Sequence, residues 1–287
     1  MNLKELGASS SPWGNQVYMA EAKAGKTCWL VASALGALPH QKGAVVSAPQ
    51  NLHLLGFDEA FGDGLVEFIT GSCKKPESFL NVTVHPMTEA RRKSGTTTEW
   101  DYAFYNETMT VVDRVKAAAA KANGVSAVVV SSLTGLTEGL LCGLAGMPNP
   151  AKRGGGMDQS KWQDLGRQVM AVRNRLVTCG LHVFWEAHIN VDKKQEGGQE
   201  VTVETVNAGK GGEARHFGAN VDFIFRLRRE MAKYDGTQVD KCYVDTKPRM
   251  GTFATGRKAA LLGEKEVDLT EILKKLGKKV HGAPLEA

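Results

Sequence analysis

The segment that most constrains the fold is residues 17–35, VYMAEAKAGKTCWLVASAL. An apolar run typical of a short buried strand leads into a turn that contains Gly25-Lys26-Thr27, and apolar residues at helical spacing follow. A turn between a strand and a helix presents several backbone N–H groups, and the helix start adds partial positive charge. The segment therefore predicts a site for an anion, and its residue types suit the phosphates of a nucleotide.

The side chains of this turn match what a triphosphate with Mg²⁺ requires. Lys26 can reach the β- and γ-phosphates, the Thr27 hydroxyl can ligate Mg²⁺, and Gly25 lets the backbone come close to the phosphates. The usual spacing, G-x-x-x-x-G-K-[ST], has glycine where this chain has Ala20, a change that is tolerated if φ is negative there. The alternative is a surface lysine in an Ala-rich turn. The predicted nucleotide-binding residues are Glu21, Ala22, Lys23, Ala24, Gly25, Lys26, Thr27 and Cys28.

Predicted strands and helices alternate along the chain to about residue 190. The strands are expected at 16–22, 43–49, 79–87, 126–136 and 181–190, and the main helices at 26–38, 100–123 and 160–180. Such alternation favours an α/β fold with a mostly parallel twisted sheet and helices on both faces. Ligands of such sheets bind at the carboxyl ends of the strands, which is where the opening segment lies.

The last third of the chain has a different pattern. Gly197-Gly198 separates two extended segments and predicts a hairpin. Near the end, Asp268 is a predicted N-cap of a short helix that stops at Gly277. We therefore expect a core over residues 1–262, followed by a capped helix and basic tail over 263–287.

Composition limits the function classes. The chain has 287 residues, 42% of them hydrophobic, enough for a substantial core. A net charge of +5 is compatible with nucleic-acid binding but does not establish it. Five single cysteines without CxxC spacing indicate reduced thiols, the N-terminus lacks an apolar signal core, and no apolar run is long enough to span a bilayer. These features predict a cytoplasmic protein without a membrane partner.

The order of several segments resembles that of RecA-like P-loop ATPases, especially the compact phage-encoded RecA-core ATPases of the AAA-family and single-strand-annealing recombinase type. The matching segments lie at 20–27, 128–136, 182–188, 218–229 and 244–258, so the resemblance covers roughly residues 14–260. It implies a RecA-like P-loop core, ATP and Mg²⁺ as ligands, single-stranded DNA as a partner, and a homo-oligomer, either a ring or a filament. If the protein is phage-encoded, its location is the host cytoplasm.

Two departures from that family concern hydrolysis. The family's Walker B strand ends in an aspartate that holds the Mg²⁺ shell, whereas this chain has Ser131, whose hydroxyl can bind a Mg²⁺ water but adds no charge. The family's second strand precedes a glutamate that orients the attacking water, and here Pro49 and Gln50 follow the predicted strand. Glu186 is a candidate for the missing carboxylate, with an ion-paired structural role as the alternative. The sequence thus predicts nucleotide binding and leaves the rate of hydrolysis open.

Further roles follow from the resemblance alone. His188 falls where the family has a polar sensor of the γ-phosphate. Lys247 and Arg249, with Arg257 as a second candidate, fall where basic residues enter the neighbouring subunit's nucleotide site. A solvated basic edge is the alternative for each of these three residues.

Two Gly-rich stretches, at about 136–160 and 189–215, match the loops that bind single strands in this family. The predicted DNA-binding residues are Lys152, Arg153, Lys193, Lys194 and Lys210, which suit sequence-independent contact with a phosphate backbone. The expected function is an ATPase that acts on single-stranded DNA in recombination, annealing or replication. The alternatives are a nucleotide-binding assembly protein with poor hydrolysis, and a helicase or packaging motor subunit.

Overall fold

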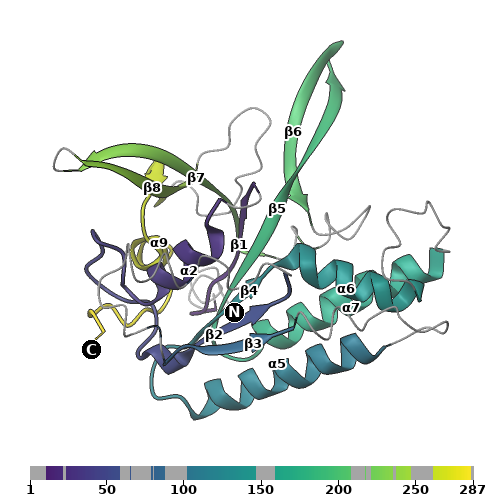
Figure 1. Cartoon of the computed structure of the whole chain (residues 1–287), viewed down its shortest axis with the longest axis horizontal. Coiled ribbons are helices and arrows are strands. Elements are labelled where there is room, and N and C mark those ends of the chain that lie inside the picture. The colour runs from purple at the N-terminus through teal and green to yellow at the C-terminus, as the bar shows by residue number, and fades with distance from the viewer. Residues whose placement is uncertain are drawn as a thin grey trace, which may run out of the picture.

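The computed structural model (Figure 1) describes residues 11–21, 24–58, 65, 79, 81–87, 102–146, 159–207, 217, 221–234, 237–246 and 261–285. The strands are β1 (Asn15–Ala20), β2 (Leu52–Gly56), β3 (Thr83–Pro86), β4 (Ala127–Ser131), β5 (His182–Glu196), β6 (Gln199–Asn207), β7 (Phe223–Tyr234), β8 (Thr237–Asp245) and β9 (Lys265–Glu266). The helices are α2 (Lys26–Ala34), α5 (Ala103–Lys121), α6 (Leu133–Ala145), α7 (Gln159–Val177) and α9 (Leu269–Lys275), with a 3-10 turn at Pro49–Asn51.

The strands of the described part of the chain form one mixed sheet. Its order is β3-β2-β4-β5-β1-β7-β8-β9, and β6 pairs with β5 alone. The pairs among β3, β2, β4, β5, β1 and β7 are parallel, and the pairs of β6, β8 and β9 with their neighbours are antiparallel. The predicted α/β class with a mostly parallel sheet is confirmed.

Each central strand buries both of its faces, which explains the nearly continuous apolar runs in the sequence. Val17 and Met19 of β1 pack on the face that α5, α6 and α7 cover, whereas Tyr18 and Ala20 pack on the face of α2 and α9. Figure 1 shows the three long helices together on one side of the sheet. The helices that follow β1 and β4, the two strands on either side of β5, therefore cover opposite faces, an arrangement that opens a ligand crevice at the strand ends.

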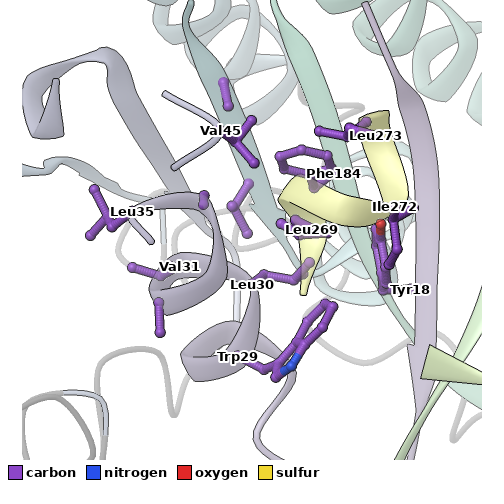
Figure 2. Packing of buried hydrophobic residues seen from close by; sticks show 14 of the residues in the cluster. Tyr18, Trp29, Leu30, Val31, Leu35, Val45, Phe184, Leu269, Ile272 and Leu273 are labelled. Carbon is purple, nitrogen blue, oxygen red and sulfur yellow. The ribbon is translucent and has the colours of Figure 1, made fainter. Parts of the chain in front are cut away.

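The C-terminal helix belongs to the core of the α2 face. Leu269 and Leu273 of α9 pack against Leu30 of α2 and Phe184 of β5 (Figure 2). The predicted cap is confirmed, because the Asp268 carboxylate accepts a 2.9 Å hydrogen bond from the Glu271 N–H. The segment 263–287 thus contributes part of the hydrophobic layer that supports α2.

The predicted hairpin at Gly197-Gly198 is confirmed as the β5–β6 turn, where both glycines have positive φ. Figure 1 shows this hairpin, and that of β7 and β8, extending away from the sheet. DNA contact by residues 189–207 stays a prediction, but the loop expected there is instead a pair of strands. Cross-strand backbone hydrogen bonds along this whole stretch are the physical reason.

The predicted second strand at 43–49 is also wrong. The backbone N–H of Val45 donates to the Ala34 carbonyl at the end of α2, and that of Ala44 donates to the Ala283 carbonyl, so neither enters the sheet. The second strand is instead β2, which pairs with β3 and β4.

The expected loop at 136–160 is wrong for its first part, which belongs to α6. Strand β4 stops at Ser131, and Ser132 caps the helix by accepting a hydrogen bond from the Gly135 N–H. Leu136, Leu140 and Leu144 then bury one helix face, and Gly146 ends the helix with φ of 65°.

Candidate functional site

The turn between β1 and α2 brings a glycine to the start of the helix. Gly25 is the N-cap of α2, with φ 76° and ψ 24° in the left-handed region that favours glycine. A Cβ at Gly25 would meet no atom within 4 Å, so backbone conformation and not space requires glycine there. Ala20, where the usual motif has glycine, is the last residue of β1 and fits a strand conformation.

Lys26 lies inside this loop and not on the surface. Its ammonium donates to the main-chain carbonyls of Glu21 at 2.9 Å and Ala20 at 3.4 Å, and the residue is only 6% exposed. Burial lowers the pKa of Lys26, and the charges of Glu186 and Asp58 oppose that effect. A surface lysine in a chance turn would not show such burial; this cation is held where phosphate oxygens can replace the carbonyls.

Three oxygen-bearing side chains meet beside the loop. The Thr27 hydroxyl donates to the Glu186 carboxylate at 2.9 Å, the Ser131 hydroxyl donates to the same oxygen at 3.1 Å, and the two hydroxyls are 3.1 Å apart. They come from α2, β4 and β5. Side chains two residues apart in a strand point to the same face of the sheet. Ser131 therefore points to the α2 face together with Val129, and Glu186 does so together with Phe184.

The Glu186 carboxyl group is buried and only partly satisfied. Burial raises its pKa to about 7, while Lys26 and the hydrogen bonds from Thr27 and Ser131 act in the opposite direction. Its Oε1 is buried without a hydrogen-bond partner, and no ion pair within 4 Å joins Glu186 to any residue that the structure describes. The alternative of an ion-paired structural glutamate therefore receives no support from the described residues.

This cluster fits Mg²⁺. Two hydroxyls and a carboxylate are the oxygen ligands that this cation prefers, and Mg²⁺ in nucleotide sites usually takes one or two carboxylates plus phosphates and waters. The described residues contain no group of three His, Cys, Asp or Glu side chains placed for a metal. Phosphate and water oxygens would thus complete the shell that Thr27, Ser131 and Glu186 begin.

Asp58 is a candidate that the sequence interpretation missed. It follows β2 by two residues and accepts a 2.9 Å hydrogen bond from the Ser132 hydroxyl. Its charge acts on the pKa values of Lys26, Glu186 and His188, so it lies within electrostatic reach of all three. Because the second strand is β2, the residue that follows it at this edge of the sheet is Asp58, whereas Pro49 and Gln50 precede it. The apolar run LHLLG before Phe57 was the available signal.

His188 lies at the same edge of the sheet, beside Ala20 in the β1–β5 register. Its backbone N–H donates to the Thr134 hydroxyl at 3.3 Å. Burial lowers the pKa of the imidazole, and the charge of Lys26 lowers it further. A neutral imidazole at this position can donate a hydrogen bond to a phosphate.

Arg226 is a second residue that the sequence did not single out. It lies on β7 with its side chain 8% exposed, and its guanidinium contacts Glu204 of β6 and lies 3.7 Å from Glu21. Glu21 directly follows β1 at the start of the loop before α2, and its carbonyl accepts a hydrogen bond from the Lys26 ammonium. Arg226 thus connects the loop to the β5–β6 hairpin.

The other predicted residues are less informative. Ala24 and Cys28 lie half-buried beside the loop, and the Glu21 side chain is 80% exposed. Lys193 is exposed and pairs with Glu200 at 2.6 Å across the hairpin. Lys194 lies in β5, but its side chain is outside the description. The residues outside the described part of the chain are Ala22, Lys23, Lys152, Arg153, Lys210, Lys247, Arg249 and Arg257.

Comparison with known proteins adds no family to this geometry. No family model matches the sequence, and a search of curated proteins gives no significant match. Within the described residues, no helix is both long enough and apolar enough to cross a membrane.

Proposed function

We propose that the chain is a RecA-like P-loop ATPase that binds ATP with Mg²⁺ at the end of β1 and hydrolyses it. The observation that carries the proposal is the placement of Lys26 within a glycine-capped loop directly beside the Thr27–Ser131–Glu186 cluster. A cation and a set of oxygen ligands so close together match the two halves of a metal–triphosphate complex. Both lie at the carboxyl ends of parallel strands, where ligands of such sheets bind.

Each residue has a role that its position supports. Lys26 and the amides at the start of α2 bind and orient the phosphates. Thr27, Ser131 and Glu186 hold Mg²⁺ directly or through its waters. A bound Mg²⁺ neutralises charge on the β- and γ-phosphates. Asp58 orients the attacking water and accepts its proton as the bond to the γ-phosphorus forms and the bond to ADP breaks. His188 donates a hydrogen bond to the γ-phosphate.

The proposal includes single-stranded DNA and a homo-oligomer, ring or filament, in the cytoplasm. Its support is the segment order noted in the sequence and the basic residues of the Gly-rich stretches. Lys247, Arg249 and Arg257 would complete the site of a neighbouring subunit, in the manner of arginine fingers. The proposed process is recombination, annealing or replication, in a phage setting.

A nucleotide-binding assembly protein without hydrolysis is the second candidate. Ser131 favours it, because the strand that usually carries the metal-shell aspartate carries a hydroxyl here. Glu186 and Asp58 favour hydrolysis, because they place two carboxylates at the same edge of the sheet.

The test is nucleotide binding and turnover by the purified chain and by Lys26→Ala, with and without Mg²⁺ and single-stranded DNA. We expect Lys26→Ala to weaken ATP binding roughly 10- to 100-fold, the cost of one charge-assisted contact or more. Lys116→Ala, on the exposed face of α5, is the matched control. Unchanged affinity in Lys26→Ala would overturn the proposal. Binding without turnover, with or without DNA, would favour the assembly protein.

A further inference from the structure

We infer that Ser132 is a positioning residue that fixes the Asp58 carboxylate for water activation, and that Gly135 leaves the space in which this carboxylate lies. The inference rests on the proposed function, because it gives Ser132 a part in the same hydrolysis. Neither residue was singled out by the sequence, and neither hydrogen-bonds to a side chain of the Thr27–Ser131–Glu186 cluster.

The hydroxyl of Ser132 has one proton, and its surroundings decide where that proton points. Ser132 is fully buried, and its Oγ accepts a 3.1 Å hydrogen bond from the Gly135 N–H as the N-cap of α6. The same Oγ lies 2.9 Å from Asp58 Oδ1, to which it donates. A hydroxyl that already accepts from a backbone amide can keep its single donor directed at the carboxylate.

Gly135 lies close to the same carboxylate oxygen. A Cβ built there would come within 2.5 Å of Asp58 Oδ1 and within 3.0 Å of the Phe57 carbonyl group. Glycine is unfavourable inside a helix, and α6 continues for ten residues beyond it. Close approach of Asp58 to the helix is a physical reason for glycine here. The first turn of a 13-residue helix also favours a nearby negative charge.

The two neighbouring serines therefore serve two different carboxylates. Ser131 donates to Glu186, in the cation cluster, and Ser132 donates to Asp58. Since both serines lie at one strand–helix junction, the junction sets where the two carboxylates stand relative to each other. Orientation of this kind raises catalysis by holding reacting groups near their productive geometry.

The test compares the binding of two ligands, one with and one without a mimic of the γ-phosphoryl group that the water attacks. ADP with Mg²⁺ and aluminium fluoride mimics the phosphoryl group in transfer, including the water position, whereas ADP with Mg²⁺ lacks that group. We expect Ser132→Ala to bind the aluminium fluoride complex about 10-fold more weakly, the effect of one hydrogen bond, and to bind ADP with Mg²⁺ unchanged. The kcat for ATP should fall by a similar factor with KM unchanged. Ser132→Thr, which keeps the hydroxyl, should restore both values.

Ser132→Ala also removes the cap of α6, so a second variant in the same helix tests whether general destabilisation of α6 lowers the affinity. Thr137→Ala removes a buried hydroxyl from the same helix; among the described residues, this hydroxyl bonds to the carbonyls of Leu133 and Thr134 alone. It should leave both affinities unchanged. Equal binding of the aluminium fluoride complex by the wild type and Ser132→Ala, or equal losses in Ser132→Ala and Thr137→Ala, would overturn the inference. Failure of the wild type to bind ADP or ATP would instead overturn the proposed function.

Discussion

The Thr27 hydroxyl donates a 2.9 Å hydrogen bond to the Glu186 carboxylate across 159 residues of sequence. Thr27 lies in the first turn of the helix after β1, and Glu186 lies on β5, the strand between β1 and β4. The contact brings a carboxylate to the place where β4 offers only Ser131. The carboxyl group beside Thr27 therefore comes from β5 and not from β4.

Exchanging the carboxylate between strands tests this relationship. Glu186→Gln keeps an acceptor for Thr27 and Ser131 but removes the charge, so we expect Mg²⁺-dependent ATP affinity to fall about 10- to 100-fold. Ser131→Asp combined with Glu186→Gln returns the charge from β4, and most of the affinity should return with it. Titration with Mn²⁺ in the presence of ATP, followed by electron paramagnetic resonance, measures the cation directly. Full affinity in Glu186→Gln alone would remove Glu186 from the cation site.

The buried Glu186 carboxyl should make stability depend on pH when no Mg²⁺ is present. Burial raises its pKa from 4.5 to about 7, so between these values the folded chain holds a proton that the unfolded chain releases. The free energy of unfolding from this group therefore falls as pH rises from 4.5 to about 7, by about 1.4 kcal/mol per pH unit. Urea unfolding in EDTA should show Glu186→Gln gaining stability relative to the wild type over that window. Parallel curves for the two proteins would contradict the prediction.

His182 should make the free energy of unfolding fall as the pH is lowered, the opposite of the effect of Glu186. Its Nδ1 accepts a 2.8 Å hydrogen bond from the Gly14 N–H, and its Nε2 lies 2.6 Å from the Lys279 carbonyl, so the folded chain requires the neutral ring. Burial lowers the pKa of His182 from 6.5 to about 4. Stability from this group is present above pH 6.5 and is lost as pH falls towards 4. His182→Asn, which keeps an acceptor for Gly14, should flatten that loss in urea unfolding measured between pH 4 and 7.5; an unchanged slope would count against it.

Arg226 should affect both stability and nucleotide binding. Arg226→Met leaves Glu204 and Glu21 without the cation that they share. We expect the free energy of unfolding to fall by about 1–3 kcal/mol, because the Arg226–Glu204 ion pair is only partly buried. ATP affinity should fall several-fold, since Glu21 carries the carbonyl that holds Lys26. Arg228→Met, on the same strand but paired with Asp245, should leave ATP affinity unchanged. Equal affinity losses in both variants would assign the effect to general destabilisation.

Local signals account for the parts of the fold that the sequence predicts well. The β1–turn–α2 unit, the Gly197-Gly198 hairpin and the capped helix after Asp268 each depend on residues close in the chain. Their geometry follows from backbone freedom at glycine, from apolar spacing and from a side chain that caps its own helix. The error at 43–49 has the complementary cause: Val45 and Val46 are buried as in a strand, but their N–H groups bond to the Ala34 carbonyl. Apolar composition indicates burial without deciding the hydrogen-bond partner.

The sequence by itself determined an α/β chain in which Gly25-Lys26-Thr27 join the first strand to the first helix. Only the tertiary structure decided which carboxylates face that turn. Glu186 and Ser131 meet through the parallel register of β4 and β5, and Asp58 reaches Ser132 across 74 residues. The physical reason is that strand order and register arise from packing of both sheet faces at once, so a side chain's neighbours across strands cannot be obtained from its neighbours along the chain.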